Sequence, residues 1–282
     1  MVISMNFINY NGKISPADLP IFTLNRAINY GDGLFETIRI HNGEILFFED
    51  HIERMLCAMR ALKLDDPESF SDVFFHKQII DLAHKERVGA NARVRIGIFR
   101  SGKGLYEPPQ NASEYFIEIL PMENGFEWSD EILEIGVFRD TPKNFSSISF
   151  FKSMNALPYV MAAIFKNVNE LGDCLLLNSE GNIADAISSN VFWIQKDKIF
   201  SPPVADGGVE GVLRKNLIRI LSLQNFSFRE MSITPAELKE ADEVFLVNVG
   251  WGIKPVTRFE DVSYATSITK AIFHLLMEGL EV

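Results

Sequence analysis

Hydrophobic and polar residues alternate with a period of two in several short stretches of the chain, and this pattern predicts β-strands. The first stretch, residues 5–10, runs into Asn11-Gly12, a dipeptide suited to the positive φ angles of a tight turn, and so predicts a hairpin. A second hairpin is predicted from residues 191–195 and 198–201. Further strands are predicted at residues 34–40, 45–48, 91–100, 113–120, 131–138 and 244–249.

Apolar residues recur at helical spacing in other stretches. One helix is predicted to begin at Asp50, which can cap it, and to bury a stripe formed by Ile52, Met55, Leu56, Met59 and Leu62. Further helices are predicted at residues 67–87, after Lys152, after residues 207–214 and at residues 263–280. Because both halves of the chain mix strands with helices, the pattern predicts an α+β fold.

The chain is long enough, at 282 residues, for two modest domains. Residues 121–125, Pro-Met-Glu-Asn-Gly, are the best candidate for a linker between them. We therefore expect a small N-terminal α+β domain at residues 1–121 and a larger C-terminal domain at residues 126–282. The loop at residues 101–109 is long for a compact domain, and loops of this kind often carry function.

Composition limits the class of protein and its partners. Hydrophobic residues make up 47% of the chain and charged residues 23%, which excludes disordered and fibrous classes. The formal net charge of −11 argues against a nucleic-acid partner, although a local basic cluster can still bind an anionic small molecule. We therefore expect a small-molecule substrate, no nucleic acid and no metal site.

The cysteines and the N-terminal residues bear on the cellular compartment. Cys57 and Cys174 lie inside apolar runs, as buried reduced thiols do. The first twelve residues lack a basic region followed by an apolar stretch, and no run of about twenty apolar residues occurs. These observations predict a cytoplasmic protein with no membrane partner.

The candidate chemistry lies between Phe150 and Phe192. Lys152 directly follows two phenylalanines, where a predicted strand ends and a helix begins. Burial disfavours the charged form of a lysine, so a partly desolvated Lys152 is a candidate nucleophilic amine. A solvated lysine at a helix start is the alternative. A polar cluster at residues 185–190 follows in the same stretch.

Two glycine-containing segments are candidate binding loops. The glycines of residues 207–211 expose backbone N–H groups where the helix dipole is positive, which favours a phosphate, although a tight turn is the alternative. Gly31-Asp32-Gly33 lacks the glycine spacing and the terminal Lys-Ser/Thr of a phosphate loop. For this second segment, a plain loop is an equally good interpretation.

Six motifs follow one another along nearly the whole chain: Arg26-Ala-x-x-Tyr-Gly-Asp-Gly-x-Phe-Glu, His51-x-x-Arg54, Lys152-x-x-Asn155, Asp185-x-x-Ser-Ser-Asn190-Val-Phe, Gly211-Val-x-Arg214 and Pro255-Val256. In this order they resemble the class IV aminotransferases. These pyridoxal 5'-phosphate enzymes of fold type IV include branched-chain and D-amino-acid aminotransferases and aminodeoxychorismate lyase. The resemblance implies two domains, the larger with a pseudo-barrel sheet, and a homodimer.

The resemblance also implies roles for two residues of the central stretch. Lys152 forms the internal aldimine with pyridoxal 5'-phosphate and then moves a proton between the substrate Cα and the cofactor C4′. Asp185 contacts the pyridine nitrogen, where the family usually has glutamate. Because aspartate is one methylene shorter, either the backbone moves in, a water bridges the gap, or the ring is less fully protonated.

Further cofactor contacts are implied at Arg54, which would bind the phosphate bidentately, and at five other positions: Asn190, Val212, Leu213, Asn248 and Val249. A surface arginine paired with a neighbouring glutamate is the alternative for Arg54. Leu213 and Val249 stand where many relatives have threonine, so backbone N–H groups or Asn248 would replace two hydroxyls. Around the substrate, the resemblance implies Tyr30, Phe35 and Glu36, with Arg100 and Tyr106 as a carboxylate clamp or, alternatively, as part of a solvated loop.

Three reactions or roles stay open. The Gly-Asp-Gly-Leu-Phe-Glu-Thr and Ser-Ser-Asn-Val-Phe segments favour an aminotransferase that acts on an amino acid and a 2-oxo acid. Leu213, Asn248 without a following threonine, Phe192-Trp193 and the Gly104-Leu-Tyr-Glu-Pro loop are reminiscent of aminodeoxychorismate lyase, which releases pyruvate and 4-aminobenzoate. A non-catalytic protein with a decayed site is the third interpretation, and the presence of Lys152 and Asp185 argues against it.

Overall fold

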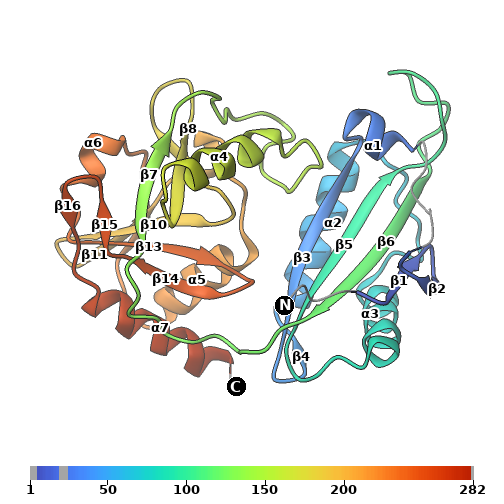
Figure 1. Ribbon diagram of the computed structural model, residues 1–282, viewed down its shortest axis with the longest axis horizontal. Coiled ribbons are helices and arrows are strands. Elements are labelled where there is room, and N and C mark those ends of the chain that lie inside the picture. The colour runs from blue at the N-terminus through green and yellow to red at the C-terminus, as the bar shows by residue number, and fades with distance from the viewer. Residues whose placement is uncertain (1–4, 19–24, 281–282) are drawn as a thin grey trace. The chain divides into compact units, whose positions relative to one another are not determined.

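The computed structural model describes residues 5–18 and 25–280 and divides the chain into two compact units (Figure 1). The N-terminal unit comprises Met1–Gly125 together with Phe151–Asn155, and the C-terminal unit comprises Phe126–Phe150 with Ala156–Val282. The segment that carries Lys152 thus groups with the N-terminal unit, whereas the predicted domains place it in the C-terminal one. In the described residues, no helix combines the length and apolar character needed to cross a bilayer.

The N-terminal unit is built on a six-stranded antiparallel sheet with the strand order β2-β1-β6-β5-β3-β4. The strands are β1 Phe7–Tyr10, β2 Lys13–Pro16, β3 Gly33–His41, β4 Glu44–Ile45, β5 Ala92–Arg100 and β6 Ser113–Pro121. The first predicted hairpin is confirmed, because Asn11 and Gly12 turn with φ of 48° and 84° between β1 and β2. The strand predicted at residues 45–48 is only two residues long, since a helix begins at Phe48.

Two long helices cover this sheet: α2 contacts β3, and α3 contacts β1 and β6 (Figure 1). The helices of the unit are α1 Arg26–Tyr30, α2 Phe48–Ala61 and α3 Asp72–Glu86. The prediction that Asp50 caps α2 is wrong: the helix begins after Phe47, and Asp50 lies in its first turn, where a carboxylate still complements the helix dipole. The second helix begins later than predicted, because the Ser71 hydroxyl accepts the N–H of Phe74 and sets its start.

The C-terminal unit contains two five-stranded sheets, ordered β12-β11-β10-β13-β14 and β16-β15-β7-β8-β9. The strands are β7 Glu134–Phe138, β8 Asp173–Leu177, β9 Ile183–Ala186, β10 Asn190–Gln195, β11 Lys198–Ser201, β12 Phe228–Glu230, β13 Glu243–Asn248, β14 Gly252–Val256, β15 Arg258–Phe259 and β16 Val262–Ser263. The helices are α4 Leu157–Val168, η1 Val204–Asp206, α5 Val212–Leu223, α6 Pro235–Leu238 and α7 Ser267–Leu280. The second predicted hairpin is confirmed in β10 and β11.

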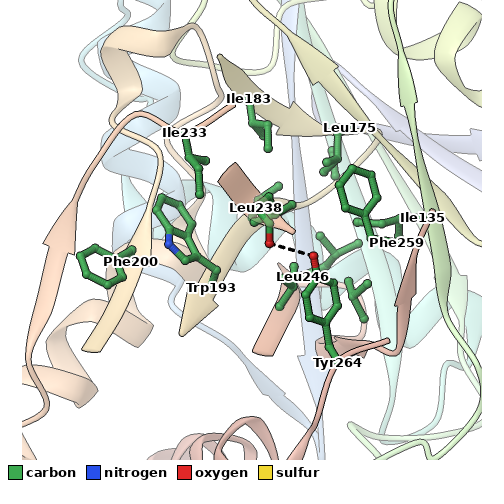
Figure 2. Close-up of a cluster of buried hydrophobic side chains, with 14 of the residues drawn as sticks. Ile135, Leu175, Ile183, Trp193, Phe200, Ile233, Leu238, Leu246, Phe259 and Tyr264 are labelled. Atoms are coloured by element: carbon green, nitrogen blue, oxygen red, sulfur yellow. Dashed lines mark hydrogen bonds between the residues drawn. The ribbon is translucent and has the colours of Figure 1, made fainter. Parts of the chain in front are cut away.

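An apolar cluster joins both sheets of this unit. Figure 2 shows Trp193 and Leu246 from one sheet together with Leu175 and Phe259 from the other, all fully or almost fully buried. The hydroxyl of Tyr264 donates to the carbonyl oxygen of Leu238 at 2.8 Å, so the polar tip of this buried ring is satisfied (Figure 2). The shared core fixes the two sheets against each other, and with them the consecutive strands β9 and β10.

Candidate functional site

Asp185 is a buried carboxylate held from three sides within the C-terminal unit. It lies on β9 and is 3% exposed. The backbone N–H of Val209 and the hydroxyl of Tyr159 donate to its Oδ2 at 3.0 and 3.1 Å, and Nδ2 of Asn190 lies 3.3 Å from its Oδ1. The donors come from the loop before α5, from α4 and from the start of β10. The carboxylate therefore has a fixed orientation and donors that favour its ionised form.

Asn190 ties Asp185 to the glycine-rich loop at residues 207–211. Its Nδ2 also donates to the carbonyl oxygen of Val209 at 2.7 Å, and its Oδ1 lies so close to Gly211 that a Cβ there would come within 1.9 Å. Glycine is therefore required at this close approach. Asn190 therefore supports the carboxylate of Asp185 and links it to this loop.

The start of α5 resembles an anion site in one respect. Its N-cap, Gly211, has no side chain to bond the first N–H groups of the helix, and those groups carry the positive end of the helix dipole. Val212 and Leu213 begin the helix with buried side chains, so only their backbone amides can serve a ligand. That these amides receive a phosphate, as the glycines at residues 207–211 suggest, stays a prediction.

Asn248 and Val249 lie at the turn after β13. The side-chain amide of Asn248 donates to the carbonyl oxygen of Ser188, and its Oδ1 accepts the N–H of Gly250 at 2.6 Å. Val249 is 8% exposed and can offer only its backbone. Asn248 thus joins this turn to the end of the Asp185 segment.

Tyr159 and Lys143 are two polar neighbours of Asp185 that no sequence motif indicates. The ring of Tyr159 packs on a small cluster that includes Phe138 and Cys174, which fixes its direction. Burial, reinforced by the Asp185 charge, raises the pKa of Tyr159 well above its ordinary range. The amine of Lys143 donates to the carbonyl oxygen of Ser149 at 3.3 Å and lies 5.9 Å from the centre of the Tyr159 ring. Burial lowers the pKa of Lys143, and the Asp185 charge acts against that shift.

Lys152 lies beside β3 in the N-terminal unit. The N–H of Phe35 donates to the carbonyl oxygen of Lys152 at 2.8 Å, the N–H of Met154 donates to that of Gly33 at 2.9 Å, and Ser153 forms an isolated bridge with Leu34. Lys152 is half-buried as a residue, and its amine lies 5.6 Å from the centre of the Phe35 ring. The predicted strand ahead of Lys152 is absent from the described residues around it, and α4 begins only at Leu157.

Glu36 is enclosed by Arg54 and His51 in the same unit. Arg54 donates through Nε and Nη2 to the two carboxylate oxygens, at 2.8 and 2.6 Å, and Nδ1 of His51 lies 2.8 Å from Oε2. Burial alone would raise the pKa of Glu36, but the Arg54 charge and the hydrogen bonds from both neighbours lower it to about 2. Glu36 is expected from the family resemblance to face the substrate; at 1% exposed, it instead pairs with the arginine that is expected to bind phosphate.

Asp32 explains the Gly31-Asp32-Gly33 segment, because it anchors the loop at residues 101–109. Its carboxylate accepts Nε of Arg26 at 2.7 Å and Nε of Arg100 at 3.0 Å. Arg26 in turn donates to the carbonyl oxygens of Leu105 and Tyr106, in the loop itself.

The guanidinium group of Arg100 is buried and bonded to other parts of the N-terminal unit. The residue is 7% exposed, and its terminal nitrogens donate to the carbonyl oxygens of Leu62 and Lys63 at 2.7 and 3.1 Å. Its Nε donates to Asp32, so these bonds together fix Arg100 at the base of the loop. They argue against a role for Arg100 in binding the substrate carboxylate. Tyr106 is 87% exposed, and its ring lies 5.4 Å from that of Tyr30, whose hydroxyl donates to the carbonyl oxygen of Gly104.

Comparison with known proteins identifies the family. Residues 33–259 match the family model described as Amino-transferase class IV. The chain belongs to the class IV aminotransferases. The match spans both units, from the Gly33 end of β3 to the Phe259 end of β15, so it includes the Lys152 and Asp185 segments.

Relatives within the class IV family carry more than one activity. The chain is 24% identical over 237 residues to aminodeoxychorismate lyase of Vibrio harveyi, which covers 83% of this chain and 85% of that protein. It is 26% identical over 256 residues to a putative branched-chain-amino-acid aminotransferase of Methanocaldococcus jannaschii, with coverages of 88% and 86%. The fold of the chain is similar to that of the branched-chain amino acid aminotransferase of Thermobaculum terrenum in its PLP form, with a TM-score of 0.86 and 20% identity. The match covers 98% of this chain and 94% of that one.

Proposed function

We propose that the protein is a pyridoxal-phosphate-dependent aminotransferase that transfers an amino group between an amino acid and a 2-oxo acid. The observation that carries this proposal is the buried Asp185 carboxylate, held by three donors at the sequence position where the family resemblance implies the partner of the pyridine nitrogen. Membership of the class IV family and the PLP form of the Thermobaculum terrenum relative support the same cofactor.

The residues suit that cofactor. Asp185 would hold the ring nitrogen, and the amine of Lys152 would hold the aldehyde carbon. The backbone N–H groups of Val212 and Leu213, at the start of α5 that no side chain caps, would receive the phosphate. Arg54 would add a guanidinium group to the phosphate site.

Supporting residues follow from the hydrogen bonds. Glu36 would orient Arg54, because it accepts two of its donors, and Asn190 would support Asp185. Tyr30, Phe35 and Tyr106 stay the proposed substrate-facing residues.

When bound, pyridoxal phosphate supplies an electrophilic carbon and a ring that accepts electron density. The protein must then move one proton and hold another. Nζ of Lys152 would move the proton from the Cα of the amino acid, with the ring of Phe35 shielding one side of the amine from water. Asp185 would keep the proton on the ring nitrogen, which a fixed anionic carboxylate does through charge and hydrogen bonding together.

We also propose that the enzyme is a homodimer that uses the exposed face of α4. Five apolar side chains recur there at helical spacing and are exposed: Leu157, Val160, Met161, Ile164 and Val168. The chain carries a formal net charge of −11, so two copies have like net charge. The α4 helix contains no acidic residue, and an apolar stripe of this kind can pair with its own copy across a twofold axis.

Aminodeoxychorismate lyase is the second candidate function. The Vibrio harveyi relative supports it, as do the apolar Leu213 and the absence of a threonine after Asn248. Both reactions use the same cofactor and begin at the same amine, so small differences in the pocket decide between them.

One experiment separates the two reactions. The protein loaded with pyridoxal phosphate is mixed with single amino acids while the absorbance of the cofactor is followed. Conversion to the pyridoxamine form is the expected result and marks transamination. Release of pyruvate and 4-aminobenzoate from aminodeoxychorismate, without a build-up of pyridoxamine, would overturn the aminotransferase proposal in favour of the lyase.

A second experiment tests the cofactor itself. Borohydride reduction should attach pyridoxal phosphate covalently to Lys152, as read by mass spectrometry of peptides, and the Lys152→Ala variant should not be labelled there. Lys198→Ala removes an exposed lysine from β11 and serves as the matched control. An unlabelled wild-type protein would overturn the cofactor proposal, and labelling of Lys152→Ala as strong as that of the wild type would overturn the assignment of Lys152.

A further inference from the structure

The short carboxylate of Asp185 depends on its surroundings more than a glutamate would. An aspartate has one methylene fewer with which to reach a ligand, so its carboxylate must be aimed by the residues around it. Three donors from three elements perform this task in the structure. Two of the donors, Val209 and Asn190, lie in or next to segments that match the family motifs. The third, Tyr159, does not.

Tyr159 is a fixed neutral donor. Its hydroxyl donates to Oδ2 of Asp185 at 3.1 Å, while its ring packs on the cluster of Phe138, Cys174 and Leu176. A phenol that is both buried and next to a carboxylate keeps its proton, so it can only donate to that carboxylate. The residue lies seven positions after Lys152, on the buried side of α4.

Lys143 supports the same geometry through the backbone. Its amine donates to the carbonyl oxygens of Ser149 and Gly207, and a Cβ at Gly207 would lie 2.2 Å from the carbonyl oxygen of Lys143. These contacts hold the start of the glycine-rich loop, whose Val209 N–H is the second donor to Oδ2. Oδ2 of Asp185 thus receives two donors whose positions are set independently, by α4 and by the loop.

We propose that Tyr159 is a positioning residue that aims the Asp185 carboxylate at the ring nitrogen of the cofactor. This inference rests on the proposed function and answers how an aspartate replaces the longer glutamate of the family. The hydroxyl of Tyr159 holds Oδ2, and the carboxylate can then present its anionic charge in one direction. No contact between Tyr159 and the substrate is needed for this role.

The test measures the dissociation constant of pyridoxal phosphate, by intrinsic fluorescence quenching, for four proteins: the wild type, Tyr159→Phe, Asp185→Asn and the double variant. Tyr159→Phe should bind the cofactor about tenfold more weakly, the size expected when a hydrogen bond to a charged group is lost. In the Asp185→Asn background the same change should have less than about a twofold effect, because the charged partner is gone. In turnover, Tyr159→Phe should lower kcat and leave KM unchanged.

Tyr264→Phe is the matched control, because it removes another buried hydroxyl of the same unit that donates only to a backbone carbonyl. It should lower the thermal unfolding midpoint about as much as Tyr159→Phe while leaving the cofactor affinity unchanged. Wild-type affinity in Tyr159→Phe, or equal effects of that change in the wild-type and Asp185→Asn backgrounds, would overturn the positioning role. An unchanged affinity in Asp185→Asn would instead overturn the assignment of Asp185 in the proposed function, and the role of Tyr159 with it.

Discussion

Arg54 and Glu36 form a buried two-pronged ion pair, in which Nε and Nη2 of the arginine donate to the two carboxylate oxygens at 2.8 and 2.6 Å. The pair joins α2 to the middle of β3, with both side chains shielded from solvent. Because the ion pair already fixes the plane of the guanidinium, Arg54 loses little further side-chain conformational entropy when it binds a phosphate. The same pair makes the N-terminal unit sensitive to acid.

We expect Glu36 to contribute roughly 3 kcal/mol of stability at neutral pH, because its pKa falls from an ordinary 4.5 to about 2 in the folded state. The unfolded chain takes up the proton first as the pH falls. The contribution is therefore complete above about pH 4.5 and is lost as the pH falls through about 2. Denaturant unfolding at a series of pH values should show this loss in the wild type.

The Glu36→Gln variant should start less stable at neutral pH, because Arg54 keeps its charge without a carboxylate, and should lose less between pH 4.5 and 2. Glu68→Gln, at an exposed position before α3, is the control and should keep the wild-type profile. A wild-type acid profile in Glu36→Gln would contradict the assignment of the shift to this residue.

Local signals explain which elements could be predicted. Asn11-Gly12 carries its own turn geometry, and the alternation of residues 191–195 and 198–201 needs no distant partner, so both hairpins follow from the sequence. The caps are harder to predict, because Asp50 and Ser71 are both good N-cap residues by type, yet Ser71 caps α3 whereas Asp50 lies inside the first turn of α2. The strands β15 and β16 are only two residues long, too brief for an alternation to be detected, and β15 also pairs with β7, which lies far earlier in the chain.

The candidate site divides in the same way. The motifs predict Lys152, Arg54 and Asp185 as functional because each combines a residue type with a spacing, and these roles stay predictions. The partners of these residues are non-local. The residues around Glu36 in the sequence do not indicate that its carboxylate pairs with an arginine eighteen positions later. Those around Asp185 do not indicate its hydrogen bond with the hydroxyl of Tyr159.

Gly33 should not tolerate a side chain. A Cβ there would lie 2.5 Å from the carbonyl oxygen of Ile98 on β5 and 2.8 Å from Cβ of Phe99, so the backbone of β3 would have to shift. We expect Gly33→Ala to lower the free energy of unfolding by about 2 kcal/mol, as overpacking does. Because the carbonyl oxygen of Gly33 also accepts the N–H of Met154, the change should disturb the Lys152 segment. Gly89→Ala, where nothing lies within 4 Å, is the control, and equal urea midpoints for the two variants would refute the clash.

Glu243 holds the start of α7. Its carboxylate, 2% exposed, accepts the N–H groups of Ile268 and Thr269 at 2.9 and 2.7 Å and the hydroxyls of Ser267 and Thr269. Glutamine would turn an NH₂ group toward these donors, so Glu243→Gln should cost about 2 kcal/mol. Calorimetry should show a lower unfolding midpoint for this variant and no change for Glu278→Gln, at an exposed position on the same helix.

The exposed apolar stripe of α4 is the proposed contact between two copies of the chain. Ile164 is 52% exposed in the middle of the stripe, and a glutamate in its place would bring two charges into a twofold contact with no basic partner in the helix beyond Lys166. We expect Ile164→Glu to raise the dimer dissociation constant at least about a hundredfold, since an isoleucine contributes about 2 kcal/mol on burial and an unpaired charge adds a further cost. Sedimentation velocity should then show a dimer for the wild type and a monomer for Ile164→Glu. Val73→Glu changes another exposed apolar residue, on α3, and should stay dimeric. A dimer that survives Ile164→Glu would place the interface on another face, because the unchanged fold of α4 would present its charge directly to the partner.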